Sequence, residues 1–164
     1  MVGSKTNQES SRVWHKTQLR VPLFEVDLGQ AVYHGNYFHL LELGREAFLR
    51  DLGYPYRRFM DQQLHLAIVE ATCSYRRSLH YDEMIEVHTG VNWWRRRSLA
   101  LSQAIYRVEE EWVLCTKATL NMVCIRFTGQ ATVLPIEFMD ILKRSFGDEE
   151  STNVETSTND DDTG

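Results

Sequence analysis

The sequence predicts an α+β domain in which a curved antiparallel β-sheet wraps around one central α-helix. One segment, residues 37–52, repeats apolar residues at helical spacing and is apolar on several sides, as expected of an enclosed helix. Four segments with β-type alternation follow it and are joined by short polar connections, which favours antiparallel pairing. A chain of 164 residues that is 43% apolar suits a single domain with a sizeable core.

The first elements are a strand and the enclosed helix. Residues 14–26 alternate apolar residues with polar or imino neighbours, which predicts an extended strand. The helix follows a tight turn, with Asn36 as its expected N-cap and Gly53 as its expected C-terminal stop. Gly44 lies on the apolar side of this helix, where the lack of a side chain would allow a close approach to a sheet.

The rest of the domain has mostly β character. A short helical or irregular piece at residues 54–63 is followed by predicted strands at 64–75, 84–94, 99–108 and 112–127. The connections SLHYDE, RRRS and EEE are short and polar, so neighbouring strands are most simply joined as antiparallel pairs. A last segment, residues 135–146, is predicted to be helical.

Acidic residues are concentrated at the C-terminus. Residues 147–164 carry seven acids and no base, whereas the rest of the chain has two more bases than acids, so the net charge of −5 comes from the tail. Such a polar segment buries too little apolar surface to offset its ordering entropy, so we expect disorder in residues 147–164 and in the similar residues 1–12. The expected folded domain is residues 13–146, and its near-neutral charge argues against a nucleic-acid binder.

The cysteines and histidines form no pattern typical of disulfides or metal sites. The three cysteines, Cys73, Cys115 and Cys124, lie in apolar runs, so we interpret them as reduced core residues. The histidines show no metal-ligand spacing, and we expect no metal and no cofactor. No run approaches the ~20 apolar residues that span a bilayer, and the first residues lack the apolar centre of a signal peptide. We therefore expect a cytoplasmic protein without a membrane span.

The most informative segment is FEVDLGQAVYHGNYFHLLELGREAFLR, in which an acid precedes a tight turn that feeds into the helix. Asp27 lies two residues before Gly29 and close to the helix start. Unpaired N–H groups and the dipole at a helix start favour developing negative charge, and a nearby carboxylate can attack a carbonyl or orient water. This pairing suits acyl transfer, with Asp27 as the catalytic carboxylate. The backbone of His34, Gly35 and Asn36 would then form the oxyanion site.

Each of these residues also has a purely structural interpretation. Asp27 could be a turn residue whose side chain bonds nearby backbone. His34 could be a general base, although a histidine at a helix start more often caps or packs. Glu42 could pair with Arg45 on a wet face, or it could support the catalytic loop from a helix that we expect to be enclosed.

The order of elements and two short motifs resemble a known family. The motifs are Asp27-x-Gly29-x-x-Val32-Tyr33-His34-x-x-Tyr37, with Glu42 five residues later, and Tyr81-Asp82-Glu83 before Ile85-Glu86-Val87. Over most of the domain the chain resembles the hotdog-fold acyl-CoA thioesterases of the 4-hydroxybenzoyl-CoA thioesterase and YbgC type. The resemblance implies the hotdog fold, hydrolysis of an acyl-CoA thioester, and Asp27 as nucleophile or general base. It also implies a site shared across a dimer, so we expect a homodimer or a homotetramer.

Substrate contacts are predicted from side-chain chemistry. CoA carries a 3′-phosphate and a pyrophosphate, and arginine forks match phosphate oxygens well. The candidate phosphate contacts are Arg76, Arg77, Arg95, Arg96 and Arg97. The candidate contacts for the rest of the substrate, including an acyl pocket, are Tyr33, Tyr37, Tyr54, Tyr56, Phe59 and Met60. Solvated charge clusters and core packing are the ordinary alternatives for these two sets.

Other functions compete with an acyl-CoA thioesterase. A thioesterase for acyl-carrier-protein or polyketide intermediates is the second hypothesis, because Val32-Tyr33-x-x-Asn36-Tyr37 also resembles the enediyne polyketide thioesterases. Those proteins generally lack the acidic nucleophile that Asp27 would supply. A third hypothesis is a module that only binds acyl-CoA. A hotdog dehydratase is disfavoured, because the spacing of acid and histidine that those enzymes use is absent from this chain. Short, long and aromatic acyl groups all stay open, because the depth of the pocket depends on two subunits.

Overall fold

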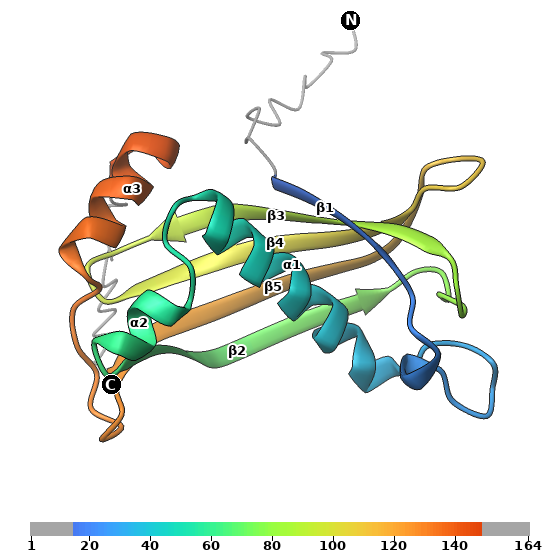
Figure 1. The fold of residues 1–164 in the computed structure, drawn as a ribbon, viewed down its shortest axis with the longest axis horizontal. Coiled ribbons are helices and arrows are strands. Elements are labelled where there is room, and N and C mark those ends of the chain that lie inside the picture. Colours follow the sequence, from blue (N-terminus) through green and yellow to red (C-terminus); the bar gives the residue numbers. More distant parts are fainter. Residues whose placement is uncertain (1–14, 149–164) are drawn as a thin grey trace, which may run out of the picture.

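The computed structural model describes residues 15–148, so the predicted disordered residues 1–12 and residues 149–164 of the acidic tail lie outside the described part. Five strands of this part form one antiparallel sheet in the order β1-β3-β4-β5-β2 (Figure 1). They are β1 (His15–Arg20), β2 (Leu64–Tyr75), β3 (Met84–Trp94), β4 (Ser98–Arg107) and β5 (Val113–Arg126). The helices are α1 (Tyr37–Asp51), α2 (Arg57–Asp61) and α3 (Ile136–Phe146), and two 3-10 turns, η1 (Leu23–Glu25) and η2 (His34–Asn36), precede α1.

The long helix α1 crosses one face of the sheet, and the sheet curves around it (Figure 1). Its buried residues are Tyr37, Leu40, Leu41, Gly44, Phe48 and Leu49. They join two apolar clusters, one with Val87 and Ile105 near the start of α1 and one with Phe138 and Leu142 near its end. This arrangement confirms the predicted α+β hotdog fold.

A close approach of α1 to β3 sets the spacing between helix and sheet. A Cβ atom added to Gly44 would lie only 2.4 Å from Val87 Cγ1. Beside this contact, the buried Gln103 side chain reaches from β4 and donates through Nε2 to Leu41 O and to Thr89 Oγ1, both at 2.9 Å. Gln103 therefore ties the helix to two strands and meets the hydrogen-bonding needs of a buried amide.

The two ends of α1 lie near their predicted positions, but the start is built differently. Asn36 is the N-cap residue of α1, as predicted, but its side chain makes no capping hydrogen bond. The turn η2 already leads into the helix there, and Asn36 Nδ2 instead donates to Glu25 O at 3.1 Å. At the other end, Gly53 has a φ of +78° and donates its N–H to Arg50 O at 2.9 Å, which confirms the predicted stop.

The main difference from the predicted strands is in the first one, which ends at Arg20 instead of residue 26. Pro22 cannot donate to a ladder, and the chain turns into η1.

Near the end of the described chain, contacts continue past the predicted boundary at residue 146, because Trp94 Nε1 donates to Gly147 O at 3.2 Å. None of the helices in residues 15–148 has the length and apolar character needed to cross a membrane.

Replacing Gly44 with alanine should destabilise the fold, because the new Cβ would overlap Val87. Overpacking costs about 1–3 kcal/mol, of which the higher helix propensity of alanine offsets up to ~1 kcal/mol. Urea titration should show a lower free energy of unfolding. The double variant with Val87→Ala should lose less than the sum of the two single losses, and strict additivity would contradict a steric contact.

Candidate functional site

The loop that carries Asp27 is a tight turn closed by its own backbone. The Asp27 N–H donates to Ala31 O, and the Gln30 N–H donates to Asp27 O, both at 3.0 Å. Gln30 has a φ of +63°, a left-handed value that lets the chain reverse within a few residues. Asp27 Oδ1 accepts the Gly29 N–H at 2.7 Å, as the structural interpretation of this aspartate anticipates.

The second carboxylate oxygen of Asp27 is open to solvent. The side chain is exposed in a hollow whose other lining residues are Leu23, Val26, Gly29, Gln30, His80 and Tyr81. Within residues 15–148, Asp27 Oδ2 makes no hydrogen bond and no ion pair. The turn therefore orients the carboxylate through one oxygen and leaves the other able to act as a base or nucleophile.

Buried Glu25 fastens this loop to the first turn of α1. Its backbone oxygen accepts the Tyr33 N–H at 3.0 Å and Asn36 Nδ2 at 3.1 Å. The whole residue is only 3% exposed, and its carboxylate oxygen Oε2 lies within hydrogen-bond distance of His39 Nδ1, at 3.0 Å. Asp27 and the helix start thus belong to one small, fixed unit.

The helix start presents two unpaired N–H groups. Across residues 15–148, the N–H groups of His34 and Gly35 donate no hydrogen bond, whereas the Asn36 N–H donates to Tyr33 O at 2.8 Å. The Asn36 N–H is therefore not free to act as the predicted oxyanion donor in this structure, and the Asn36 side chain instead binds the Glu25 carbonyl. The His34 carbonyl accepts the Tyr75 O–H at 2.7 Å. Unpaired N–H groups at a helix start are well suited to hold an anionic oxygen.

The side chains of His34 and Tyr33 lie outside the core, beside this start. The His34 imidazole packs at a tilt of 43° against the Tyr33 ring, with 4.2 Å between centroids, and makes no hydrogen bond to Asp27. The Tyr33 ring also covers Gly35, because a Cβ atom there would lie 3.0 Å from Tyr33 Cε1. Tyr33 thus stays a candidate substrate contact. Of His34, the backbone N–H stays the candidate part of the site.

Three other aromatic residues that we expected to contact substrate lie in the core instead. Tyr37 is 3% exposed, and its hydroxyl accepts the Leu79 N–H at 3.2 Å. Burial raises the pKa of Tyr37, so this phenol stays neutral. Tyr54 and Phe59 have no exposed surface and pack against each other and Phe138. Both α2 and α3 contribute to this cluster, so Tyr54 and Phe59 are not part of a pocket wall.

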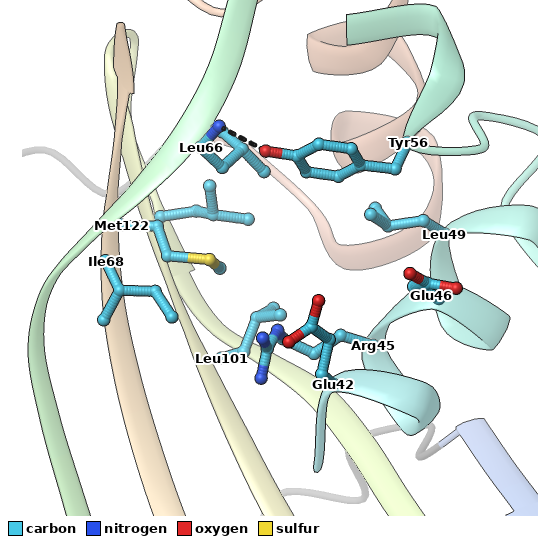
Figure 2. A pocket seen from close by; sticks show the side chains of 10 residues that line it. Glu42, Arg45, Glu46, Leu49, Tyr56, Leu66, Ile68, Leu101 and Met122 are labelled. Carbon is cyan, nitrogen blue, oxygen red and sulfur yellow. Dashed lines mark hydrogen bonds between the residues drawn. The ribbon is translucent and has the colours of Figure 1, made fainter. Parts of the chain in front are cut away.

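A cavity of about 210 Å³ lies between α1 and the sheet (Figure 2). Its lining residues are the apolar Leu49, Leu66, Ile68, Leu99, Leu101 and Met122 and the polar Glu42, Arg45, Glu46 and Tyr56. Tyr56 is the predicted pocket aromatic that reaches it, and its hydroxyl accepts the Leu66 N–H at 3.1 Å. Complete small-molecule sites usually occupy about 300–1,000 Å³, so this cavity suits one part of a ligand, such as an acyl group.

Arg45 is the cation in the wall of this cavity (Figure 2). Its Nη1 donates to Gln103 Oε1 at 3.3 Å, and no carboxylate of residues 15–148 is close enough to form an ion pair with it. Burial lowers the pKa of Arg45, and the charge of Glu42 acts in the opposite direction. Glu42 is exposed on the cavity wall and makes no hydrogen bond to the Asp27 loop within the described chain, so the structure shows neither of its two alternatives, the pair with Arg45 or the support of that loop.

Two of the predicted arginines share an end of the sheet with the helix start. Arg76 and Arg77 directly follow β2, and their N–H groups donate to Cys115 O at 2.8 and 3.2 Å. The last residue of β2 is Tyr75, which bonds His34. The exposed side chains of Arg76 and Arg77 are therefore placed near the candidate site.

The arginines after β3 lie at the opposite end. Strand β3 has 11 residues, which span roughly 35 Å. Asp27 lies at the end of the sheet where β3 begins, beside His80 and Tyr81. Arg95 lies over the Trp93 ring at 4.7 Å, and Arg96 is exposed in the hairpin to β4. Within one chain, Arg95 and Arg96 are not part of the site around Asp27.

The cysteines are free thiols that fit the predicted structural role. Cys115 and Cys124 are buried and Cys73 is half-buried, and burial raises the pKa of all three thiols. In the described part of the chain, no group of three or more His, Cys, Asp or Glu side chains could hold a metal ion. The expectation of no metal and no cofactor stays a prediction.

Comparison with known proteins assigns the family. Residues 21–142 match the family model described as the thioesterase-like superfamily. The chain belongs to this superfamily. A relative from Escherichia coli O6:H1, named acyl-CoA thioester hydrolase YbgC, is 27% identical over 65% of this chain and 78% of its own length. Membership of the thioesterase-like superfamily confirms the predicted family and the class of enzyme that it implies.

Solved structures of similar proteins share the fold. A hypothetical protein from Aquifex aeolicus superposes with a TM-score of 0.72 at 29% identity, over 79% of this chain and 99% of that one. A 4-hydroxybenzoyl-CoA thioesterase variant in complex with 4-hydroxybenzoyl-CoA superposes with a TM-score of 0.71 over 78% and 97% of the two chains. At 19% identity the second likeness shows the fold alone.

Sequence reasoning missed three contributors to the site of this thioesterase-like protein, namely Glu25, His39 and Tyr75. The Glu25 to His39 contact joins residues 14 positions apart, and the Tyr75 to His34 bond joins residues 41 positions apart. No local pattern marks such contacts. Tyr75 could have been found only from the predicted pairing of β2 together with the position of α1.

Proposed function

We propose that this chain is an acyl-CoA thioesterase that hydrolyses an acyl-CoA to the free acid and CoA. The observation that carries the proposal is one anchored loop that combines an open carboxylate oxygen on Asp27 with unpaired N–H groups on His34 and Gly35. The name of the YbgC relative, an acyl-CoA thioester hydrolase, supports the same activity.

In the proposed reaction, the thioester carbonyl oxygen accepts hydrogen bonds from the His34 and Gly35 N–H groups, which stabilise the charge that develops on it. Asp27 Oδ2 either attacks the carbonyl carbon, giving a mixed anhydride that water then hydrolyses, or removes a proton from an attacking water. In both routes the C–S bond breaks and CoA leaves as a thiolate. Rapid-quench mass spectrometry separates the routes, because only direct attack leaves an acyl adduct on Asp27.

The cavity beside α1 supports a site for the acyl group. Arg45 lies eight residues beyond Tyr37, which is ~12 Å along the helix axis, so an acyl group that reaches it from the helix start extends several carbons beyond the thioester. The apolar walls fit a carbon chain or ring. Arg45 and the Tyr56 hydroxyl can each donate a hydrogen bond, which favours an acyl group with an acceptor atom near its far end.

Features of the sheet edge and of the Asp27 loop favour a second copy of the chain beside the site. Strand β2 has 12 residues and lies at one edge of the sheet, and Ile68 and Val69 on it are 47% and 63% exposed. The loop around Asp27 also exposes Leu23, Phe24 and Leu28. Long, apolar edge strands readily pair with another chain. We therefore include a homodimer formed through β2 in the proposal, while the homotetramer and the cytoplasmic location stay predictions.

Asp27→Asn should lower kcat for CoA release by about 100-fold or more, because an amide can act neither as base nor as nucleophile. The measurement is thiol release from a panel of short, long and aromatic acyl-CoAs. Asp61→Asn, on α2 and away from the loop, is the matched control and should keep the native kcat.

A folded Asp27→Asn variant with the native rate would overturn the assignment of Asp27. Native protein that binds acyl-CoA tightly without turnover would favour the non-catalytic module. Turnover of acyl-carrier-protein thioesters alone would favour the carrier-protein hypothesis.

Arg45→Met should raise KM for 8-hydroxyoctanoyl-CoA between about 10- and 100-fold relative to octanoyl-CoA, because a hydrogen bond from a charged donor contributes about 1.5–3 kcal/mol. Steady-state kinetics on both substrates measures the ratio. An equal loss for both substrates would mean that Arg45 supports the structure and does not recognise the acyl group.

Val69→Lys should shift the protein from dimer to monomer in analytical ultracentrifugation, because lysine on an edge strand opposes strand pairing. Thr128→Lys adds the same charge on an exposed turn and should leave the association unchanged. A native dimer in Val69→Lys would contradict pairing through β2.

A further inference from the structure

We propose that Tyr75 is a positioning residue that orients and polarises the Gly35 N–H as a donor to the thioester oxyanion. This inference rests on the proposed thioesterase function. Tyr75 is the last residue of β2, and its phenol O–H donates to the His34 carbonyl oxygen at 2.7 Å. No motif in the sequence points to this residue.

The geometry of the peptide bond links the two groups. The carbonyl of His34 and the N–H of Gly35 belong to the same peptide unit, which is trans, as are all peptide bonds of the described chain. In a trans peptide unit the C=O and N–H bonds point in opposite directions within one plane. A donor that holds the carbonyl of His34 therefore fixes the direction of the Gly35 N–H, which points away from Tyr75.

The Gly35 N–H is available for this task. It donates no hydrogen bond within residues 15–148. A hydrogen bond to the carbonyl side of a peptide unit also polarises its N–H, because chains of hydrogen bonds strengthen one another. Tyr75 would therefore make the N–H both better aimed and a stronger donor.

Tyr75 is itself held in place by rigid elements. Its backbone pairs with Thr116 at the end of the β2 and β5 ladder. Its ring packs on the edge of Tyr37, the first residue of α1, with 4.9 Å between centroids. The hydroxyl thus connects the sheet to the η2 turn, which by itself is only three residues long.

The protonation state of Tyr75 suits a permanent donor. Tyr75 is 47% exposed, and the partial loss of hydration on its buried side, with a contribution from the nearby Cys73 thiol, raises its pKa to about 12. The O–H is therefore retained at every pH at which the free enzyme would be assayed. A phenolate could not donate to the carbonyl.

The test is Tyr75→Phe, which keeps the ring and removes the hydroxyl. We expect kcat for the best acyl-CoA to fall between about three- and tenfold, with KM within a factor of about two, since a neutral hydrogen bond is lost but the oxyanion donor remains. Tyr106→Phe is the matched control, because Tyr106 lies on β4 and packs on His88 and Trp112, away from the loop. It should keep the native kcat.

A spectroscopic readout separates positioning from a structural role. In the Asp27→Asn background, the C=O stretch of a bound ¹³C-labelled acyl-CoA should lie at lower frequency than in water, and adding Tyr75→Phe should remove part of this shift. An unchanged kcat, or an unchanged carbonyl frequency with bound substrate, would overturn the role of Tyr75. A native protein without any turnover would instead overturn the proposed function.

Discussion

The site depends on how closely α1 lies on the sheet. Gly44 removes the side chain that would otherwise hold the helix away from Val87, and Gln103 then spans the narrow gap with two hydrogen bonds. At this distance the first turn of α1 meets the end of β2, where the Tyr75 hydroxyl can reach His34. A larger separation would break the buried amide contacts and would also release the helix start from the sheet.

The loop that carries Asp27 is held in place by a second acid, the buried Glu25. Glu25 places both its carbonyl and its carboxylate against the helix start, while Asp27, two residues later, faces solvent. Burial of a carboxylate is unfavourable without a partner, and His39 Nδ1 is the partner of the Glu25 carboxylate. Two acids of one short loop thus lie in different surroundings, one enclosed by the protein and one exposed to solvent.

Much of the fold could be predicted from periodicity, and much of the site could not. The enclosed helix, the Gly44 contact and the four later strands follow from local patterns of apolar residues. Tyr54 and Phe59 have the composition of a pocket wall, but α3 covers them, and this packing has no local signature. Arg95 and Arg96 form the most conspicuous basic cluster, yet the length of β3 carries them away from Asp27. The proximity of Asp27 to the helix start could be predicted because it is local in the sequence, whereas the contacts of Glu25 and Tyr75 exist only in the folded chain.

The hydrogen bond between Trp94 and Gly147 holds the last described residues at one end of the sheet. Trp94 ends β3, so the carbonyl that it binds lies at the end of the sheet opposite Asp27. A purification tag or surface tether joined directly to Asp148, in place of residues 149–164, would start at that far end, away from the hollow around Asp27. A shortened chain that ends at Asp148 could therefore be fixed to a sensor or a resin through that residue without covering the hollow.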